Sequence, residues 1–541
     1  MWKDRSGDGE VARLAAGAGA GAMSIATDRA ASTTQPATAS PRNPWFLLAT
    51  ASATCALISL DTNIVAVSLP SISRSFHTGF ESVEWVVSAY MVSFASCLLP
   101  MGGIADRYGR KKLLLLGLLV FAMASLGCGL APGVTFLTIA RALKGIGAAM
   151  LLTAALAVIA HAFPGPRERA RAWAIWGMTM GIATTIAPLV GGAITQWVGW
   201  RWIFLLNLPV CAVLIVCAQR AVAESRNPHA AWVDLGGSLL FGIGLASGIW
   251  ALIGTQGAGW HAPVTYARFA ACVVLLVSFI VVERRVDHAV IDLSLFRQAR
   301  FVAAVLGMFG YAACAQVMMT FLPLYLQNAY AWSPMRAGLG MLPFALSMIV
   351  GPTLGARIAR RATGATSTLS IGLGIVGFGN LLTAACAPTG AYEWVALGMV
   401  MTGLGAGVLN GDTQKAIMAC VPSHRTGMAS GISTTTRFTA IVASIGVLGA
   451  VLASRTQAAI DAATQCHSTA GNCVDARFMS DLLAGDVGHA LTRLAPDVQR
   501  MLAPIAPAGF ASGFASALNV AGTLALAVSV MIWLLAGRRH T

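Results

Sequence analysis

The stretch 102-GGIADRYGRKK-112 decides how this chain folds, because it joins two long apolar segments through a short, glycine-rich and strongly basic loop. Small glycines let helix ends approach closely, and Asp106 can accept charge-assisted hydrogen bonds from an arginine or from a helix N-terminus. Arg107, Arg110 and Lys111 are suited to anchor the loop at a membrane surface. A generic basic loop explains these charges but not their order around Asp106.

The composition excludes an ordinary soluble domain. The chain has 541 residues, of which 57% are hydrophobic and 11% are charged, whereas soluble domains average about 25% charged residues. Long apolar runs recur, and a lipid environment requires backbones that satisfy their own hydrogen bonds, so we expect an all-α integral membrane protein. The short alternating segments of a membrane β-barrel are absent.

Hydropathy predicts fourteen spans, at 46–68, 84–104, 113–131, 135–161, 169–195, 201–221, 235–254, 267–283, 301–325, 336–358, 367–387, 391–419, 427–453 and 513–536. Lys and Arg concentrate in the loops on the side of the N-terminal tail, whereas the opposite short loops carry only Arg74, Arg201, Arg268 and Arg336. By the positive-inside rule, both termini are cytoplasmic. The same rule accounts for the net charge of +15, so we expect no nucleic-acid partner.

The predicted organisation has a disordered cytoplasmic tail at 1–43, a six-helix bundle at 44–223, two extra transmembrane helices at 224–290, and a second six-helix bundle at 291–541. A long outer loop at 454–512 lies within the second bundle. We expect a solvated loop with short amphipathic helices there, the alternative being a partner-binding element. Cys466 and Cys473 lie in this loop and are a candidate disulfide.

The segment 57-LISLDTNIVAVSLP-70 places a carboxylate, Asp61, in the middle of the first predicted span. A charge at that depth costs about 2.5–3.5 kcal/mol by insertion scales, so intramembrane acids are functional candidates by default. A carboxylate there can bind a proton, and Arg141 in the fourth span is the candidate partner that keeps its charge. Lys144, on the same helical face, can join them. A purely structural role for Asp61, bonded to a neighbouring helix, remains the alternative.

The second half offers a further candidate site. Asp412 and Lys415 are spaced for a local ion pair, and the alternative is a second protonation or substrate site at Asp412. Arg437 is expected to face the interior of the protein. The candidate substrate-contacting aromatic residues are Tyr90, Tyr311 and Tyr325, although most such residues only pack.

The sequence contains neither an ATP-binding motif nor a metal-binding pattern. The phosphate-binding pattern of ATP-driven pumps, G-x-x-x-x-G-K-[ST], does not occur, and the nine His residues lack metal-ligand spacing. We therefore expect no enzymatic site, no metal and no cofactor.

Several segments together resemble one family. The loop 102–112, with Gly103, Asp106, Arg107, Gly109, Arg110 and Lys111 in order, is similar to the signature loop of the major facilitator superfamily. LDTNIVAVSLPSI, 141-RALKGIG-147 and 200-WRWIFLLNLPV-210 resemble segments of its fourteen-span drug:proton antiporters, the EmrB/QacA type. The fifth span keeps Pro188, Gly191 and Gly192 of the antiporter motif but has Ala187 before the proline. The resemblance implies the major facilitator fold, with two six-helix bundles plus two extra helices.

The resemblance also implies a function. We expect a proton-coupled exporter of amphipathic or cationic small molecules, working by alternating access in the plasma (inner) membrane. Its expected partners are the small-molecule substrate, protons and the lipid bilayer, and a periplasmic adaptor protein remains an open alternative. Two alternative hypotheses remain open: a transporter of the same fold that is specific for one metabolite, and a receptor or scaffold whose outer loop carries the function.

Overall fold

The structure, a computed structural model, describes residues 43–163, 165–226, 235–258, 261–285, 293–361, 365–421, 426–464, 476–484 and 487–537. These residues form helices joined by short connections, and no strand occurs among them. The all-α fold class predicted from the apolar segments is therefore confirmed. The predicted tail, 1–43, lies outside the described residues except for Asn43.

Asn43 fixes where the first helix begins. Its side-chain oxygen accepts hydrogen bonds from the backbone N–H groups two and three residues later, at 3.1 and 3.2 Å, and Pro44 follows where a missing N–H costs nothing. Helix α2 (Pro44–Phe76) is capped at its C-terminal end by His77, whose φ is 50°. Its two ends define the Asn43 side and the Phe76 side of the protein.

The rest of the first half consists of α3 (Phe80–Tyr108), α4 (Arg110–Gly129), α5 (Val134–Ala162), α6 (Pro166–Trp197), α7 (Trp202–Leu205) and α8 (Asn207–Ala221). Helix α5 packs along both α3 and α4, and α2 packs along α6. Within α3 the axis bends by 51° between Leu98 and Pro100. Because proline lacks an N–H and clashes with the preceding turn, Pro100 accounts for the bend.

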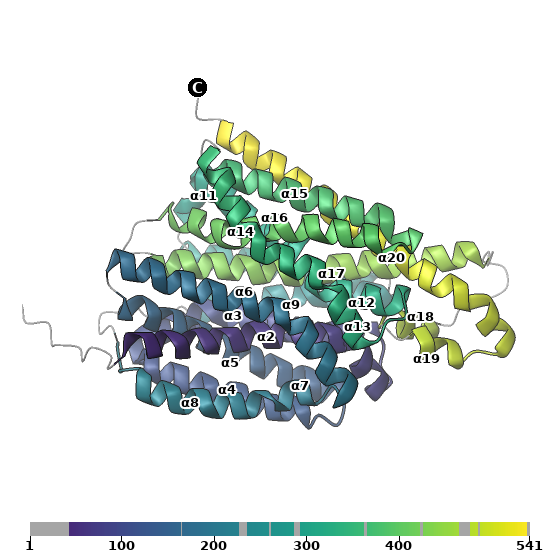
Figure 1. Ribbon diagram of the computed structural model, residues 1–541, viewed down its shortest axis with the longest axis horizontal. Coiled ribbons are helices and arrows are strands. Elements are labelled where there is room, and N and C mark those ends of the chain that lie inside the picture. The colour runs from purple at the N-terminus through teal and green to yellow at the C-terminus, as the bar shows by residue number, and fades with distance from the viewer. Residues whose placement is uncertain are drawn as a thin grey trace, which may run out of the picture. The chain divides into compact units, whose positions relative to one another are not determined.

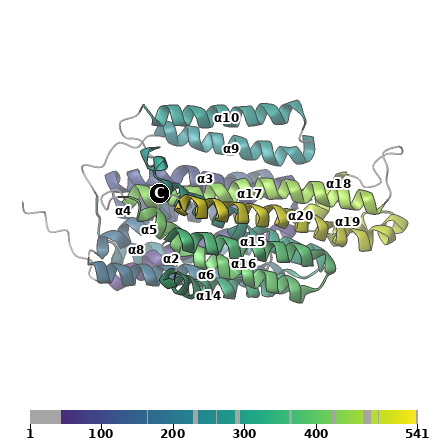
Figure 2. The same cartoon turned by 90° about the horizontal axis from the view of Figure 1, so that it is seen from above.

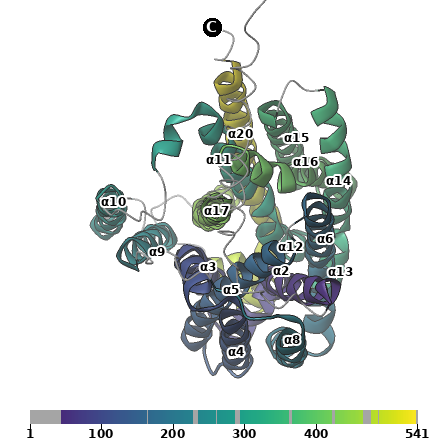
Figure 3. The ribbon, with the colours of Figure 1, turned by 90° about the vertical axis from the view of Figure 1, so that its left-hand side faces the viewer.

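Two helices lie beside the bundles: α9 (Leu235–Ala258) and α10 (Pro263–Glu283). Figures 2 and 3 show both at one edge, with α10 outermost and α9 next to α3. Helix α9 packs against α3 of the first half and α17 (Thr426–Ala463) of the second. It therefore covers the line along which the two halves meet.

The second half consists of η1 (Leu293–Arg297), α11 (Ala299–Tyr311), the π-helical turn η2 (Ala312–Gln316), α12 (Met318–Ala329), α13 (Pro334–Gly340), α14 (Leu342–Arg361), α15 (Ala365–Cys386), η3 (Ala387–Thr389), α16 (Tyr392–Met418), α17 and α20 (Pro496–Gly537). Among the described residues, 13 helices are long and apolar enough to cross a membrane, and the bent α3 raises the number to 14. Each of the fourteen predicted spans thus corresponds to one helix or to consecutive helical segments.

The two halves touch each other mainly toward the Phe76 side. Gln327 of α12 donates a hydrogen bond to the carbonyl of Val67 in α2 at 3.1 Å, and the backbone N–H of Met335 donates to Gln196 of α6 at 3.2 Å. Thr185 also donates to the carbonyl of Ala345 at 3.5 Å, and Arg493 contacts His77 at 3.4 Å, again nearer this side. Figure 1 shows α12 and α13 where the halves come together.

The predicted outer loop, 454–512, contains the ends of two long helices. Helix α17 continues to Ala463 and α20 already begins at Pro496, so the apolar runs that set the prediction cover only part of each helix. The described part of the connection contains α18 (Ala476–Leu483) and α19 (Val487–Thr492). Arg493 pairs with Asp481 at 2.9 Å. Cys466 and Cys473 lie outside the described residues.

Candidate functional site

Asp61 lies at the centre of a buried charge cluster. Its Oδ2 accepts a hydrogen bond from Arg141 Nη1 at 3.0 Å, and its Oδ1 accepts one from Lys144 Nζ at 2.5 Å. The exposed fractions are 2% for Asp61 and 0% for each cation. The sequence predicted Arg141 as the partner of Asp61 but could not show that the two side chains touch. In the structure they are hydrogen-bonded.

Arg141 is held by more than the ion pair. Its Nε donates to the carbonyl of Val86 in α3 at 3.0 Å, and its guanidinium carbon lies 4.2 Å from the ring centre of Tyr90. The Nη2 atom is buried and has no hydrogen-bond partner. Arg141 therefore has N–H donors on Nη2 that are not used in this arrangement, close to the Asp61 carboxylate.

Lys144 follows Arg141 by one helical turn and points to the same carboxylate. Its Nζ lies 4.7 Å from the ring centre of Phe121 and 4.9 Å from that of Phe204. Gly145 permits the close approach of α5 to α3, because an added Cβ would lie 2.3 Å from the carbonyl oxygen of Tyr90. Aromatic faces and tight backbone packing thus seal the cluster from water.

Asn207 completes the cluster and was missed by the sequence reasoning. Its Nδ2 donates to Asp61 Oδ1 at 3.2 Å from the first residue of α8, just after the break that separates α7 from α8. The available signal was a lone amide within the apolar run 200-WRWIFLLNLPV-210. Asp61 is thus bonded from two further helices of the first half, α5 and α8.

The signature loop lies at the Asn43 side, between α3 and α4. Asp106 accepts bonds from Arg110 at 2.7 and 3.0 Å, the arginine partner that the sequence suggested. Glu224, which the sequence reasoning did not nominate, accepts from the N–H groups of Lys111 at 3.1 Å and Lys112 at 3.3 Å. Its carboxylate therefore caps the N-terminus of α4, where negative charge is stabilising.

Gly109 lets the Glu224 carboxylate reach the N-terminus of α4. Its φ is 120°, a value that side chains other than hydrogen rarely tolerate, and a Cβ there would lie 2.6 Å from Glu224 Oε1. Gly103 and Arg107 lie in the last turns of α3. The loop is thus tied to the end of the sixth span.

The antiporter motif in α6 lies where the halves touch. A Cβ on Gly192 would lie 2.6 Å from the carbonyl oxygen of Pro334, and one on Gly338 would lie 2.6 Å from that of Pro188. Gly191 faces α2 instead, with Ile64 O at 2.9 Å from a built Cβ. The small residues of this motif therefore allow backbone contact between the halves on the Phe76 side.

The candidate residues of the second half separate into different places. Arg437 Nε donates to Gln316 of the π-helical turn at 2.6 Å, and Tyr311 Oη donates to Asn410 at 3.0 Å. π-helical turns are frequent at functional sites. Asp412 pairs instead with Lys415 at 3.0 Å, the local pair that their spacing allows.

The other two aromatic candidates are distant from that group. Tyr325 stacks on Phe514 with ring centres 4.3 Å apart and donates to the carbonyl of Ala387 at 2.9 Å. It is fully buried, which matches a packing role. Tyr90 belongs to the Asp61 cluster through Arg141.

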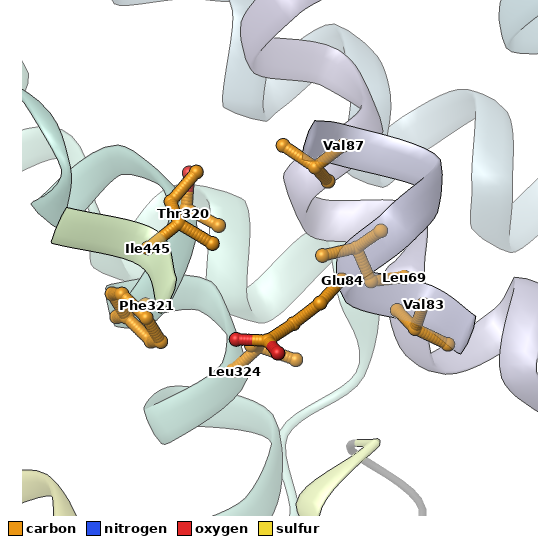
Figure 4. Close-up of a pocket in the computed structure, with 8 residues that line it drawn as sticks. All are labelled: Leu69, Val83, Glu84, Val87, Thr320, Phe321, Leu324 and Ile445. Carbon is orange, nitrogen blue, oxygen red and sulfur yellow. The ribbon is translucent and has the colours of Figure 1, made fainter. Parts of the chain in front are cut away.

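A small cavity lies at the contact between the halves, toward the Phe76 side. Figure 4 shows its lining, which comes from α2, α3, α12 and α17 and consists of Leu69, Val83, Glu84, Val87, Thr320, Phe321, Leu324 and Ile445. Its volume of about 10 Å³ approaches the space of a single water molecule. Drug-sized ligands need about 300–1,000 Å³, so this cavity is no substrate site.

The chemistry available to the Asp61 cluster is proton binding and ion-pair exchange. In the described part of the chain, no group of three or more His, Cys, Asp or Glu side chains could hold a metal ion. A carboxylate between two cations can accept a proton only if those cations release it.

Comparison with known proteins gives one answer for the family. Residues 51–446 match the Major Facilitator Superfamily. The multidrug resistance protein Stp of Mycobacterium tuberculosis is 34% identical over 406 residues, which is 75% of each chain. The methylenomycin A resistance protein of Streptomyces coelicolor is 31% identical over 74% of this chain and 83% of its own. The puromycin resistance protein pur8 of Streptomyces alboniger is 32% identical over 72% and 78%.

Solved structures agree on the fold. The peptide transporter POT in complex with sulfate has a TM-score of 0.59 at 15% identity and covers 92% of this chain and 95% of its own. A bacterial homologue of the human lysosomal transporter Spinster has a TM-score of 0.60 at 14% identity, covering 91% and 97%. At such identities the likeness shows the fold alone.

Proposed function

The chain belongs to the major facilitator superfamily, and we propose that it is a proton-coupled exporter of small amphipathic molecules. It is a multi-pass membrane transporter and not an enzyme. The names of the relatives, which include resistance to several unlike compounds, support export over uptake of a single metabolite. The observation that carries the coupling role is the sealed ion cluster around Asp61.

Proton coupling follows from the charges of the cluster. With Asp61 ionised, Arg141 and Lys144 are both compensated and the three side chains are held together. A proton on Asp61 removes the only described carboxylate from this cluster and leaves two cations facing each other. Because like charges repel strongly in a low-dielectric site, protonation favours a different arrangement of α2 and α5.

Alternating access determines the directions in which substrate and proton cross the membrane. We place the Asn43 side in the cytoplasm, because basic residues concentrate in its loops, and the Phe76 side outside. The contacts of Gln327 and Pro334 with the first half then close the outer side, so the state described is one that loads substrate from the cytoplasm. A proton reaches Asp61 after these contacts open.

Transport in vesicles tests the proposal. Wild type, reconstituted with a pH gradient, should move a fluorescent amphipathic substrate against its own gradient, and Asp61→Asn should only equilibrate it. A variant that still accumulates substrate in proportion to the pH gradient would show that Asp61 is not the coupling residue. A wild type that moves no member of a chemically diverse panel would argue against broad export and for the single-metabolite transporter.

A further inference from the structure

Arg437 lies inside a membrane span without an acidic partner. It is part of α17 within the spanning segment Gly431–Ala463, and it is only partly buried. The partners of its guanidinium group are neutral: Gln316 Oε1 at 2.6 Å and the ring of Tyr311 at 5.7 Å. Among the described residues, no carboxylate forms an ion pair with it. A charge at this depth is costly unless it has a counter-ion to bind.

The hydrogen bonds of Arg437 leave the two terminal Nη groups of its guanidinium free. Nε is used by Gln316, and the two Nη groups donate to no described residue. Two parallel N–H donors match the two oxygens of a carboxylate or sulfonate, a geometry that lysine cannot reproduce. Tyr311 is fixed by its bond to Asn410 and presents its ring face to the same guanidinium.

The Asp61 cluster belongs to the first half, on the opposite side of the contact between the halves from Arg437. It carries a net positive charge, because it has one carboxylate for two cations. Aromatic rings connect the two places: the Tyr90 ring, which Arg141 covers, lies 5.9 Å from that of Phe94, and Phe94 lies 4.2 Å from Phe438 of α17. Phe438 is the neighbour of Arg437 in the chain. Positive charge therefore predominates on both sides of this contact.

Neither Asp412 nor Glu84 reverses that sign. Asp412 is neutralised by Lys415 at 3.0 Å. Glu84 precedes Phe94 by ten residues in α3, which displaces it about 15 Å toward the Phe76 side at 1.5 Å per residue. A substrate at the level of Arg437 thus meets a cation first.

We propose that this transporter prefers amphipathic molecules that carry an anionic group, a carboxylate or sulfonate, and that Arg437 binds this group. The proposal rests on the proposed export function and defines its substrate class, which the sequence reasoning had expected to include cations. The Nη groups bind the anion, and the buried Tyr311 ring, fixed by Asn410, holds the guanidinium in place. A cationic analogue of equal size would meet like charge from Arg437 and from the excess cation beside Asp61.

A matched pair of probes tests the preference without any mutation. Pyrenesulfonate and pyrenylmethyl-trimethylammonium share one apolar body and carry permanent opposite charges. Fluorescence anisotropy with the purified full chain should show at least about tenfold tighter binding of the sulfonate. Tighter binding of the ammonium probe would overturn the proposal and leave the export function standing, because that function depends on the loss of proton-driven accumulation in Asp61→Asn.

Two variants then assign the effect to one side chain. Arg437→Gln should remove most of the difference between the two probes, because only the excess cation beside Asp61 then remains, and Arg437→Lys should keep an intermediate difference, since the bidentate geometry is lost. Arg500→Gln is the matched control, because Arg500 is 79% exposed and pairs with Asp497 at the start of α20. If Arg437→Gln, shown to be folded by its retained binding of the ammonium probe, keeps the sulfonate preference, the assignment is wrong.

Discussion

Asp61 and Arg141 are 80 positions apart in the sequence, yet Arg141 Nη1 lies 3.0 Å from Asp61 Oδ2 in a site that is almost fully buried. The pair is asymmetric, because Arg141 is also bonded to Val86 O and Asp61 is also bonded to Lys144 and Asn207. Loss of the negative charge therefore affects three side chains of the cluster at once. This dependence makes the cluster suitable for sensing a single proton.

Asp61→Asn should abolish proton-driven accumulation and also reduce stability. Removing one partner of a buried ion pair typically costs about 3–5 kcal/mol, because the remaining charges stay unpaired. The double variant Asp61→Asn/Lys144→Gln restores the charge balance and should recover much of the unfolding temperature, but not the transport. Recovery of proton-driven transport in the double variant would contradict the coupling role.

Asn207→Leu should slow transport without abolishing it. The amide contributes one neutral hydrogen bond at 3.2 Å to Asp61 Oδ1, whereas the cations contribute charge. Neutral hydrogen bonds contribute about 0.5–1.5 kcal/mol net, so we expect roughly a three- to tenfold change in the substrate-driven proton flux. A loss as complete as that of Asp61→Asn would show that Asn207 is itself on the proton path.

The sequence predicts the fold class and the site of the charge cluster for physical reasons. Apolar length and charge bias identify spans because the bilayer imposes one solvent on the whole chain. Asp61 stands out because a carboxylate is rare in such a segment. Asn207 and Glu224 do not, since a lone amide or a loop acid is common and acquires meaning only through distant contacts.

The outer loop shows the limit of the same reasoning. Hydropathy ends a span where the apolar run ends, but α17 and α20 continue as helices beyond it to Ala463 and from Pro496. The partners of Arg437 could not be predicted either, because they depend on the π-helical turn at Ala312–Gln316. Local composition does not reveal such a turn.

Gly192→Val should shift the protein away from the state described. Its side chain would collide with the carbonyl of Pro334, 2.6 Å from a built Cβ, so the contact that closes the Phe76 side cannot form. We expect faster hydrogen exchange in α12 and α13, measured by mass spectrometry. Gly181→Val is the matched control on the same helix, where nothing lies within 4 Å of a built Cβ. Equal exchange in both variants would argue against a gate at this contact.

Glu224→Ala should destabilise the signature loop. The carboxylate caps two N–H groups of α4, and losing a helix cap costs about 0.5–2 kcal/mol. We expect a lower unfolding temperature and a larger change at low than at high salt, because the interaction with the helix terminus is screened. Asp497→Ala, which removes an exposed acid from a surface pair, should change little. An unchanged unfolding temperature for Glu224→Ala would show that the cap is dispensable.

The membrane potential distinguishes the substrate classes. Exchange of one proton inward for one organic anion outward moves two charges in the same electrical sense, whereas exchange for a monovalent cation moves none. Each charge carries about 2.3 kcal/mol per 100 mV, so export of the sulfonate probe should accelerate steeply under an inside-negative potassium diffusion potential. Arg437→Gln should lose this export in parallel with its binding of the sulfonate, while Arg500→Gln should keep it. A sulfonate flux that does not respond to the potential would contradict one-proton exchange of an anion.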